Sequence, residues 1–322
     1  MLYFVRKLYH PEFYQGPRRL KRYFEGWYYK TVTSDGAFAV IPGVSRARDD
    51  PHAFVQYLDG ETGRSAYHRF PLDAFAFRRD RFEIAVGKNR FSSQRFQVDL
   101  PEIECDLEIV RPAGWPSSLS SPGTMGWYSF VPFMQCRHGI IVMDAVARGT
   151  VNGTAVDDGR LYVEKDYGVS FPNAWVWTQC NTFNQPGVSV SCSIANVPFV
   201  GGAFTGMLAG ILVDGDLHRF TTYTGARLAL LEVDHRGVRI VVEDRRERLE
   251  IMTERTSGTD LPAPELGAMT GRVAETLRSR IDVTLSVDHH TVFSGSGARA
   301  GLELVAHERL ITAGQVLPRS DL

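Results

Sequence analysis

Cysteine is scarce in this sequence, and other signatures of common protein classes are missing. No two of the four cysteines have the spacing of a zinc site or a redox pair, and nothing indicates a disulfide framework. No apolar run reaches the roughly 18 residues of a membrane-spanning helix, and none of signal-peptide length follows Arg6 and Lys7. These absences predict a soluble, reduced, cytoplasmic protein and leave peripheral membrane contact open.

An excess of charge of one sign is also missing, since Lys and Arg total 36, Asp and Glu total 37, and the net charge is −1. Such a chain has no overall field that would attract nucleic acid. No Gly-rich phosphate loop is present, and Ser129 lacks the context of a nucleophile elbow. His289 and His290 are adjacent without a third ligand nearby, which favours a turn over a metal site. We therefore expect no nucleic-acid partner, no metal and no cofactor.

Helical periodicity is weak along almost the whole chain. Short alternating segments rich in β-branched and aromatic residues recur instead, separated by Gly, Asp, Asn and Pro. The predicted strands fall at residues 24–33, 38–44, 52–58, 66–77, 81–86, 90–98, 104–110, 127–134, 138–148 and 161–166. Residues 264–280 carry an apolar stripe that fits a helix, and an irregular connection is the alternative.

The order of features begins again after about 150 residues. Trp27-Tyr28-Tyr29-Lys30 corresponds to Trp175-Val176-Trp177-Thr178, and two later segments correspond at a similar offset. This repeat predicts an all-β chain of two barrel or sandwich modules, at residues 1–170 and 171–322. A coincidence between two alternating patterns is the alternative.

The stretch from residue 164 to 183 is the most informative part of the sequence. Trp175, Trp177, Gln179 and Asn181 follow one another at a spacing of two, which places all four side chains on one face of a strand. Two indoles beside two amides make a candidate pocket wall for a flat, amphipathic molecule. Alternatively, the indoles belong to the core and the amides satisfy backbone groups in a turn.

Three segments of the chain carry a resemblance to a known family, the weakest of them at Asp214-Gly215, Phe220 and Gly225. Residues 24–30, Phe-Glu-Gly-Trp-Tyr-Tyr-Lys, are similar to the opening signature of the tocopherol cyclase family. Its central signature is resembled by Glu164-Lys165, Gly168, Phe171-Pro172 and Trp175-x-Trp177-x-Gln179-Cys180-Asn181-x-Phe183. The resemblance extends roughly from residue 18 to residue 305. It implies two lipocalin-like antiparallel β-modules, and closure of a chromanol ring on a phenol that carries a prenyl tail.

The chain also departs from the plant-type pattern of that family. Asp166 and Tyr167 stand where the plant-type sequence has Asn and Trp, and residues 125–134 look more like the bacterial branch. The resemblance therefore leaves the substrate open.

Closing a chromanol ring is an isomerisation in which an alkene gains a proton and the phenol oxygen captures the cation. It needs an acid, cation stabilisation and a dry apolar groove, but no redox cofactor or metal. Glu164 is the candidate acid if burial raises its pKa, and Asp166 is a second carboxyl that would receive the phenol proton. For both, a solvated strand end is the alternative. Glu25 is a further catalytic candidate, although a structural ion pair with Lys30 or an Arg is the role we favour.

Aromatic and amide side chains supply the candidate substrate-binding residues, which are Trp27, Tyr28, Trp127, Trp175, Trp177, Gln179, Asn181 and Tyr223. Trp27 and Tyr28 are adjacent, so they face opposite ways on a strand and one of them belongs to the core. His138 and Asp144 would share a face of a regular strand. For His138 we favour a hydrogen-bonded structural role over assistance in proton transfer.

Two other classes of function compete with a cyclase. A lipocalin-like carrier of a lipophilic small molecule would use the same apolar lining, but it would avoid a buried carboxyl, which costs free energy. A hydratase of an isoprenoid alkene would differ only in that water captures the cation. All three have a lipophilic small molecule as partner, and the oligomeric state stays open.

Overall fold

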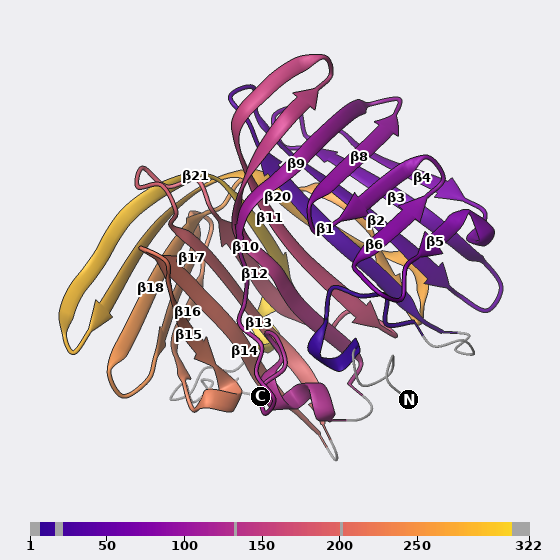
Figure 1. Cartoon of the computed structure of the whole chain (residues 1–322). Coiled ribbons are helices and arrows are strands. Elements are labelled where there is room, and N and C mark those ends of the chain that lie inside the picture. The colour runs from indigo at the N-terminus through magenta and orange to yellow at the C-terminus, as the bar shows by residue number, and fades with distance from the viewer. Residues whose placement is uncertain (1–6, 17–21, 132–133, 200–201, 311–322) are drawn as a thin grey trace.

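The structure, a computed structural model, describes residues 7–16, 22–131, 134–199 and 202–310. The chain is all-β and lipocalin-like, as predicted, and forms two large antiparallel sheets that lie side by side (Figure 1). The first sheet has the order β4-β3-β2-β1-β11-β10-β9-β8-β7-β6-β5. Its strands are β1 (Phe24–Val32), β2 (Ala37–Arg46), β3 (Pro51–Asp59), β4 (Ser65–Phe70), β5 (Phe75–Phe77), β6 (Glu83–Val86), β7 (Asn89–Ser92), β8 (Arg95–Leu100), β9 (Ile103–Ala113), β10 (Cys136–Val151) and β11 (Thr154–Gly168).

The second sheet has the order β15-β14-β13-β12-β21-β20-β18-β17-β16, with β19 paired to β20. Its strands are β12 (Trp175–Cys180), β13 (Ser189–Phe199), β14 (Gly202–Val213), β15 (Asp216–Thr221), β16 (Arg227–Val233), β17 (Gly237–Glu243), β18 (Glu247–Glu254), β19 (Thr259–Glu265), β20 (Ala268–Val287) and β21 (His290–Val305). The described part also contains a helical turn at residues 7–9 and four short 3-10 helices, namely η1 (Leu72–Ala74), η2 (Gly126–Phe130), η3 (Thr222–Thr224) and η4 (His307–Arg309). None of these described helices has the length or the apolar character that crossing a membrane requires.

Strand alternation divides the apolar side chains into three packed clusters. Trp27 and Tyr29 of β1 point into the core of the first sheet, and Val176 of β12 points into the core of the second. Tyr28 and Trp177 belong to a third cluster, which packs between the two sheets. Since successive side chains of a strand point to opposite faces, each central strand serves its own core and the layer between the sheets.

The repeat aligns one residue away from the predicted register. Tyr28 pairs with Glu164 across β1 and β11, and Trp177 pairs with Glu303 across β12 and β21. Tyr28 and Trp177 are therefore the structural counterparts, rather than Trp27 and Trp175. A slip of one residue exchanges the two faces of a strand, so alternation alone could not fix this register. The first sheet ends at Gly168 and the second begins at Trp175; a division into modules at residues 1–170 and 171–322 remains our proposal.

Two predicted elements are wrong. Residues 264–280 are not a helix but lie in β19 and β20, which are joined by a tight turn at Leu266 and Gly267, both with positive φ. The apolar residues Val273 and Leu277 are four apart, a spacing that fits a helix and one face of a strand equally well. The strand predicted at residues 127–134 is also wrong in its described part, since Gly126–Phe130 forms η2; Pro132 and Phe133 lie outside the described residues.

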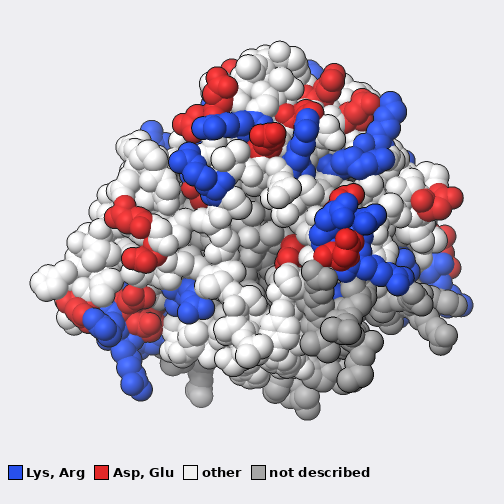
Figure 2. Space-filling view, in the orientation of Figure 1, with Lys and Arg blue, Asp and Glu red and all other residues white. Residues whose placement is uncertain are grey.

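Charged side chains of both signs are interspersed on the face shown in Figure 2, and the middle of this face is largely uncharged. The arrangement agrees with the net charge of −1.

Candidate active site

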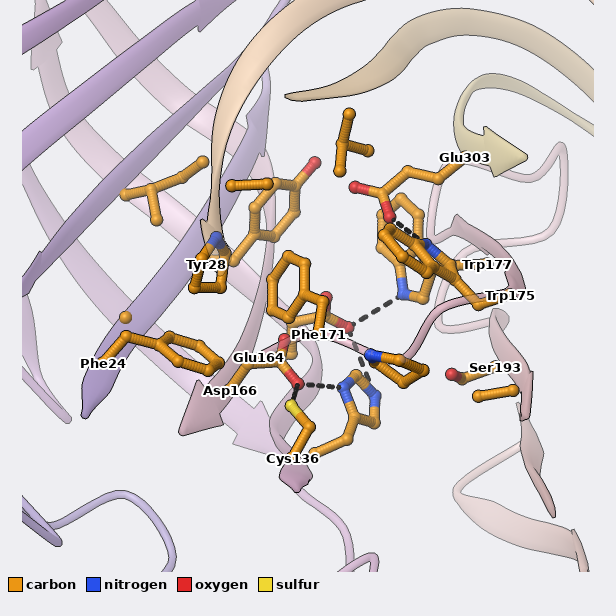
Figure 3. A pocket seen from close by; sticks show the side chains of 18 of the residues that line it. Phe24, Tyr28, Cys136, Glu164, Asp166, Phe171, Trp175, Trp177, Ser193 and Glu303 are labelled. Carbon is orange, nitrogen blue, oxygen red and sulfur yellow. Dashed lines mark hydrogen bonds and ion pairs between the residues drawn. The ribbon is translucent and has the colours of Figure 1, made fainter. Parts of the chain in front are cut away.

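A cavity of about 170 Å³ lies between the two sheets. Its walls come from β1, β2, β3, β10 and β11 of the first sheet and from β12, β13, β14, β19, β20 and β21 of the second. Most of the lining is apolar and includes Phe24, Phe54, Met125, Phe171, Met207 and Leu261. Four carboxyl groups and one imidazole enter this apolar space, and the site is built around them (Figure 3).

Glu164 of β11 lines the cavity and is 6% exposed. Its Oε2 atom accepts hydrogen bonds from Tyr162 Oη at 2.5 Å and from Trp177 Nε1 at 3.0 Å. Both donors are neutral and lie in the layer between the sheets. Among the described residues, none donates a hydrogen bond to the other oxygen, Oε1. One oxygen is thus held by the protein and the other is left for a proton.

Burial raises the pKa of Glu164 to about 7, because the apolar surroundings penalise the charged form. Positive charge on His138 opposes this rise, and the neighbouring Asp166 carboxylate adds to it. The hydrogen bonds from Tyr162 and Trp177 also oppose the rise, since they stabilise the carboxylate. The carboxyl is therefore largely protonated below about pH 7, and the hydrogen bonds from Tyr162 and Trp177 stabilise the anion that forms when it gives up its proton, as a general acid requires.

His138 of β10 lies between the two carboxyls of β11. Its Nδ1 is 3.1 Å from Asp166 Oδ1, and its Nε2 is 3.6 Å from Glu164 Oε2. Nε2 is buried and has no hydrogen-bond partner among the described residues. Burial lowers the pKa of His138, but the charges of Asp166 and Glu164 outweigh it and raise that pKa to about 9. The imidazole is consequently a cation at neutral pH, and its Nε2–H is directed toward Glu164.

His138, Glu164 and Asp166 are also the one described cluster whose donor atoms are close enough for a metal ion. One donor atom of each lies within 4.8 Å of the others. A Glu, an Asp and a His form a donor set that divalent metals accept. However, the raised pKa values of Glu164 and His138 mean that a metal would have to displace two protons. We therefore interpret Glu164 as a hydrogen-bonded acid rather than as a metal ligand. Turnover in the presence of a chelator distinguishes the two roles.

A second pair of carboxyls enters the cavity from the other sheet. Glu275 of β20 and Glu303 of β21 are direct cross-strand neighbours. Glu275 accepts a hydrogen bond from Tyr28 Oη, and Glu303 Oε2 accepts one from Trp175 Nε1 at 2.7 Å. Burial raises the pKa of Glu275 to about 7 and raises that of Glu303 well above its ordinary range.

Five of the predicted site residues come together in this cavity. Glu164, Asp166, Tyr28, Trp175 and Trp177 all line it. The Tyr28 and Trp177 rings meet edge to face with centroids 5.6 Å apart, and both pack in the layer between the sheets.

The other predicted site residues lie outside the cavity lining. Glu25 is buried in the first sheet and pairs with Lys165 at 2.6 Å, a structural ion pair whose partner was not among those considered. Trp27 packs in the same core, on the face of β1 opposite to Tyr28. Gln179 Oε1 accepts from Lys30 Nζ at 2.8 Å, and the Asn181 amide donates to Asp144 at 3.3 Å, so both amides serve buried structural contacts.

Two aromatic candidates are also placed elsewhere. Trp127 is 49% exposed and belongs to η2, because the predicted strand does not form. Tyr223 Oη donates to the Thr124 carbonyl at 2.9 Å and ties η3 to the segment before η2. Neither side chain lines the cavity.

Sequence reasoning missed Glu275 and Glu303 and undervalued His138. His138 was paired with Asp144 on the assumption of a regular strand, but β10 has irregular register between Ile140 and Ala145. Asp144 instead pairs with Arg160. His138 lies opposite Asp166 in the β10–β11 ladder. Only a correct prediction of this strand register would have brought the two residues together.

Two lipocalin-like sheets that enclose an apolar cavity with buried acids define the class of protein. The chain belongs to the tocopherol cyclase-like family, because that family's model matches residues 100–305, well over half of its length. The chloroplastic tocopherol cyclase of Zea mays is 27% identical over 168 residues, which are 48% of this chain and 35% of the relative. The probable chloroplastic tocopherol cyclase of Oryza sativa subsp. japonica is 27% identical over 121 residues, which are 35% of this chain and 26% of the relative. The matches thus span roughly a third or less of these relatives.

Solved structures show the same fold at low identity. CghA, in a crystal structure with Sch210972, has a TM-score of 0.54 and 11% identity, with coverage of 88% of this chain and 89% of that one. Kievitone hydratase from Nectria haematococca has a TM-score of 0.50 and 12% identity, with coverage of 88% and 90%. At these identities the likeness shows the fold alone.

Proposed function

We propose that this protein is a cofactor-independent intramolecular cyclase that closes a chromanol-type ring on a lipophilic, prenylated phenol. The observation that carries the proposal is Glu164, a buried carboxyl with a pKa of about 7 that faces an apolar cavity and accepts an indole hydrogen bond. Membership of the tocopherol cyclase-like family supports the same class of reaction. A carrier of neutral lipids would gain nothing from four carboxyls in its binding cavity, because each costs free energy to bury.

The first step is protonation of the substrate alkene. The proton on Glu164 Oε1 adds to the less substituted alkene carbon, and a tertiary cation forms on the other carbon. The Glu164 carboxylate that remains is stabilised by Tyr162 Oη and Trp177 Nε1, and the Nε2–H of the His138 cation moves into hydrogen-bond range of Oε2. Asp166 acts through His138, because it fixes the ring orientation and keeps the imidazole charged.

The second step is ring closure. The phenol oxygen forms a bond to the tertiary carbon and loses its proton to the Glu164 carboxylate, rather than to Asp166, whose Oδ1 is held by His138 Nδ1. This transfer restores the acid and leaves no net change in composition. Trp175 and Trp177 line the cavity, and an indole face turned toward the cation would stabilise it by roughly 0.5–2 kcal/mol. The apolar walls exclude water, which would otherwise capture the cation.

A turnover assay on a panel of prenylated hydroquinones tests the proposal. Cyclisation leaves the mass unchanged and shifts the chromatographic retention, whereas hydration adds the mass of water. An isobaric, enzyme-dependent product in the presence of a strong chelator supports the metal-free acid mechanism. A product that requires added divalent metal would make His138, Glu164 and Asp166 a metal site instead, and binding without any product would favour the carrier.

A further inference from the structure

Glu275 and Glu303 form a carboxyl pair that the proposed acid, Glu164, does not need. The two residues are directly opposite each other in the β20–β21 ladder, and both side chains line the cavity. Glu275 is 2% exposed, and Glu303 is half-buried. In Figure 3 the carboxyl of Glu303 lies on the other side of the two indoles from Glu164.

Among the described residues, no cation forms an ion pair with either carboxyl of this pair. The hydrogen bonds that the two carboxyls accept come from the neutral donors Tyr28 Oη and Trp175 Nε1. Lys30 lies near enough to influence Glu275, but its ammonium group donates to Gln179. Two adjacent carboxylates without a counter-ion cannot both remain charged in an apolar space, so the pair retains at least one proton.

A protonated carboxyl is both a donor and an acceptor of hydrogen bonds. Each member of the pair has one oxygen engaged by its neutral donor, and the described residues supply no hydrogen bond to the other oxygen. The free oxygens therefore offer a donor and an acceptor to a molecule in the cavity. Such a pair complements a neutral hydroxyl or carbonyl group, and it repels an anion.

The position of the pair follows from the pairing between the two sheets. Tyr28 of the first sheet donates to Glu275 of the second, and Trp177 of the second sheet donates to Glu164 of the first. Each sheet thus contributes one acid centre to the cavity, Glu164 from the first sheet and the Glu275–Glu303 pair from the second. An aromatic side chain of the opposite sheet donates a hydrogen bond to each centre. All three carboxyls line one cavity, and the charge of Glu164 contributes to the raised pKa of both Glu275 and Glu303, so the two centres lie within one binding space.

We propose that Glu275 and Glu303 are substrate-positioning residues. They bind the hydroxyl of a neutral hydroquinone ring that does not enter the new ether, while the alkene and the hydroxyl that closes the ring lie at Glu164. The position of the alkene at Glu164 rests on the proposed function. Binding of the ring by Glu275 and Glu303 is measured without turnover. Such binding limits the substrate class to uncharged molecules with an oxygen-bearing ring and an apolar tail, and it excludes carboxylates and phosphates at the ring end.

Binding of unreactive probes tests this inference. The probe is a hydroquinone whose prenyl tail has been saturated, and its matched control is the same tail on a benzene ring without oxygen. For Glu275→Leu and Glu303→Leu we expect an affinity loss of about tenfold for the hydroquinone and little change for the control, because only a hydrogen bond is lost. Glu303→Gln keeps a neutral donor and should stay within about threefold of the wild type. Equal losses for both probes, or no loss for either, would overturn the proposal.

Two further measurements serve as controls. Glu164→Gln should bind both probes as the wild type does, because Glu164 acts on the alkene and the probes have saturated tails. The wild-type protein alone should bind an analogue with a carboxylate on the ring at least tenfold more weakly than the hydroquinone, and equal or tighter binding would refute the proposal even if the Leu variants failed to fold. Since the probes cannot react, failure to cyclise any substrate would count against the proposed function and leave this result intact.

Discussion

Glu164 and Lys165 are neighbours in β11 whose side chains serve opposite faces of the first sheet. Glu164 enters the cavity between the sheets, where its partners are an aromatic hydroxyl and an indole. Lys165 enters the core of the first sheet, where it pairs with Glu25 at 2.6 Å and donates to the carbonyls of Pro11 and Phe13. One strand thus holds the proposed acid on one face and a buried ion pair on the other, and changes to the two residues should have different effects.

Lys165→Met should reduce stability strongly. The substitution leaves Glu25 buried without its cation, and breaking a buried ion pair on one side costs about 3–5 kcal/mol. Chemical denaturation would show the loss. Lys88→Met is the control, because Lys88 pairs with Asp99 on the surface and its side chain is 83% exposed, so little change is expected. A loss in Lys165→Met no greater than in the control would show that the pair does not stabilise the sheet.

Glu164→Gln should abolish turnover and leave the fold and ligand binding nearly intact. Removing a general acid typically costs about 10²- to 10⁴-fold in rate. The glutamine occupies the same volume and can still accept from Tyr162 and Trp177. Turnover and thermal unfolding are measured together, with Glu254→Gln as an exposed control. If Glu164→Gln retains activity, another group is the acid; if it unfolds, Glu164 is structural.

Trp177→Phe should shift the pH dependence of kcat. Phenylalanine keeps an aromatic face but loses the N–H that stabilises the Glu164 carboxylate, so the pKa of Glu164 should rise. Because the protonated acid is the active form, activity falls as pH rises through that pKa, and the fall should move to higher pH. Trp175→Phe is the matched control, since its N–H binds Glu303, and it should leave this limb in place. Identical shifts in both variants would contradict the assignment.

Asp166→Asn should lower the pKa of His138 from about 9. Asp166 supplies the strongest of the charges that oppose the burial of the imidazole, and the amide cannot replace it. Titration of the imidazole signals by NMR measures the change, and the other histidines serve as internal references. An unchanged His138 titration would mean that Asp166 does not hold the ring in its charged form.

The free energy of unfolding should fall as pH rises from about 4.5 to about 7, and Glu275→Gln should reduce this fall. The pKa of Glu275 is raised from 4.5 to about 7 in the folded protein, so its stabilising proton is fully retained below the unfolded value and lost as pH rises through the folded one. The expected loss is on the order of 1–3 kcal/mol. Denaturation at a series of pH values gives the unfolding free energy as a function of pH. This plot should be flatter for Glu275→Gln than for the wild type, and parallel plots would contradict the raised pKa.

Alternation made much of this architecture predictable, and its limits explain what was missed. The pattern Trp175, Trp177, Gln179 gave the correct face of β12, and adjacency correctly separated Trp27 from Tyr28. It could not show that the amides meet Lys30 and Asp144 rather than a ligand, because that depends on which strands pack behind them.

The histidine and the second acid pair were hidden for related reasons. His138 comes next to Asp166 only through the β10–β11 register, and irregular pairing further along β10 separates it from Asp144. Glu275 falls within the stretch that was predicted as a helix, and a helix would have no cross-strand partner. Its pairing with Glu303 therefore could not be predicted. A residue spacing of four is common to both periods, and only the partner strands decide between them.

Proton transfer from Glu164 to carbon is the central claim, and turnover in deuterium oxide tests it most directly. The wild-type protein should convert a prenylated hydroquinone into a cyclised product that carries one non-exchangeable deuterium on the carbon next to the new ether carbon. Glu164→Gln should form no such product above the uncatalysed background. A cyclised product without carbon-bound deuterium, or full deuterium incorporation by Glu164→Gln, would contradict the account.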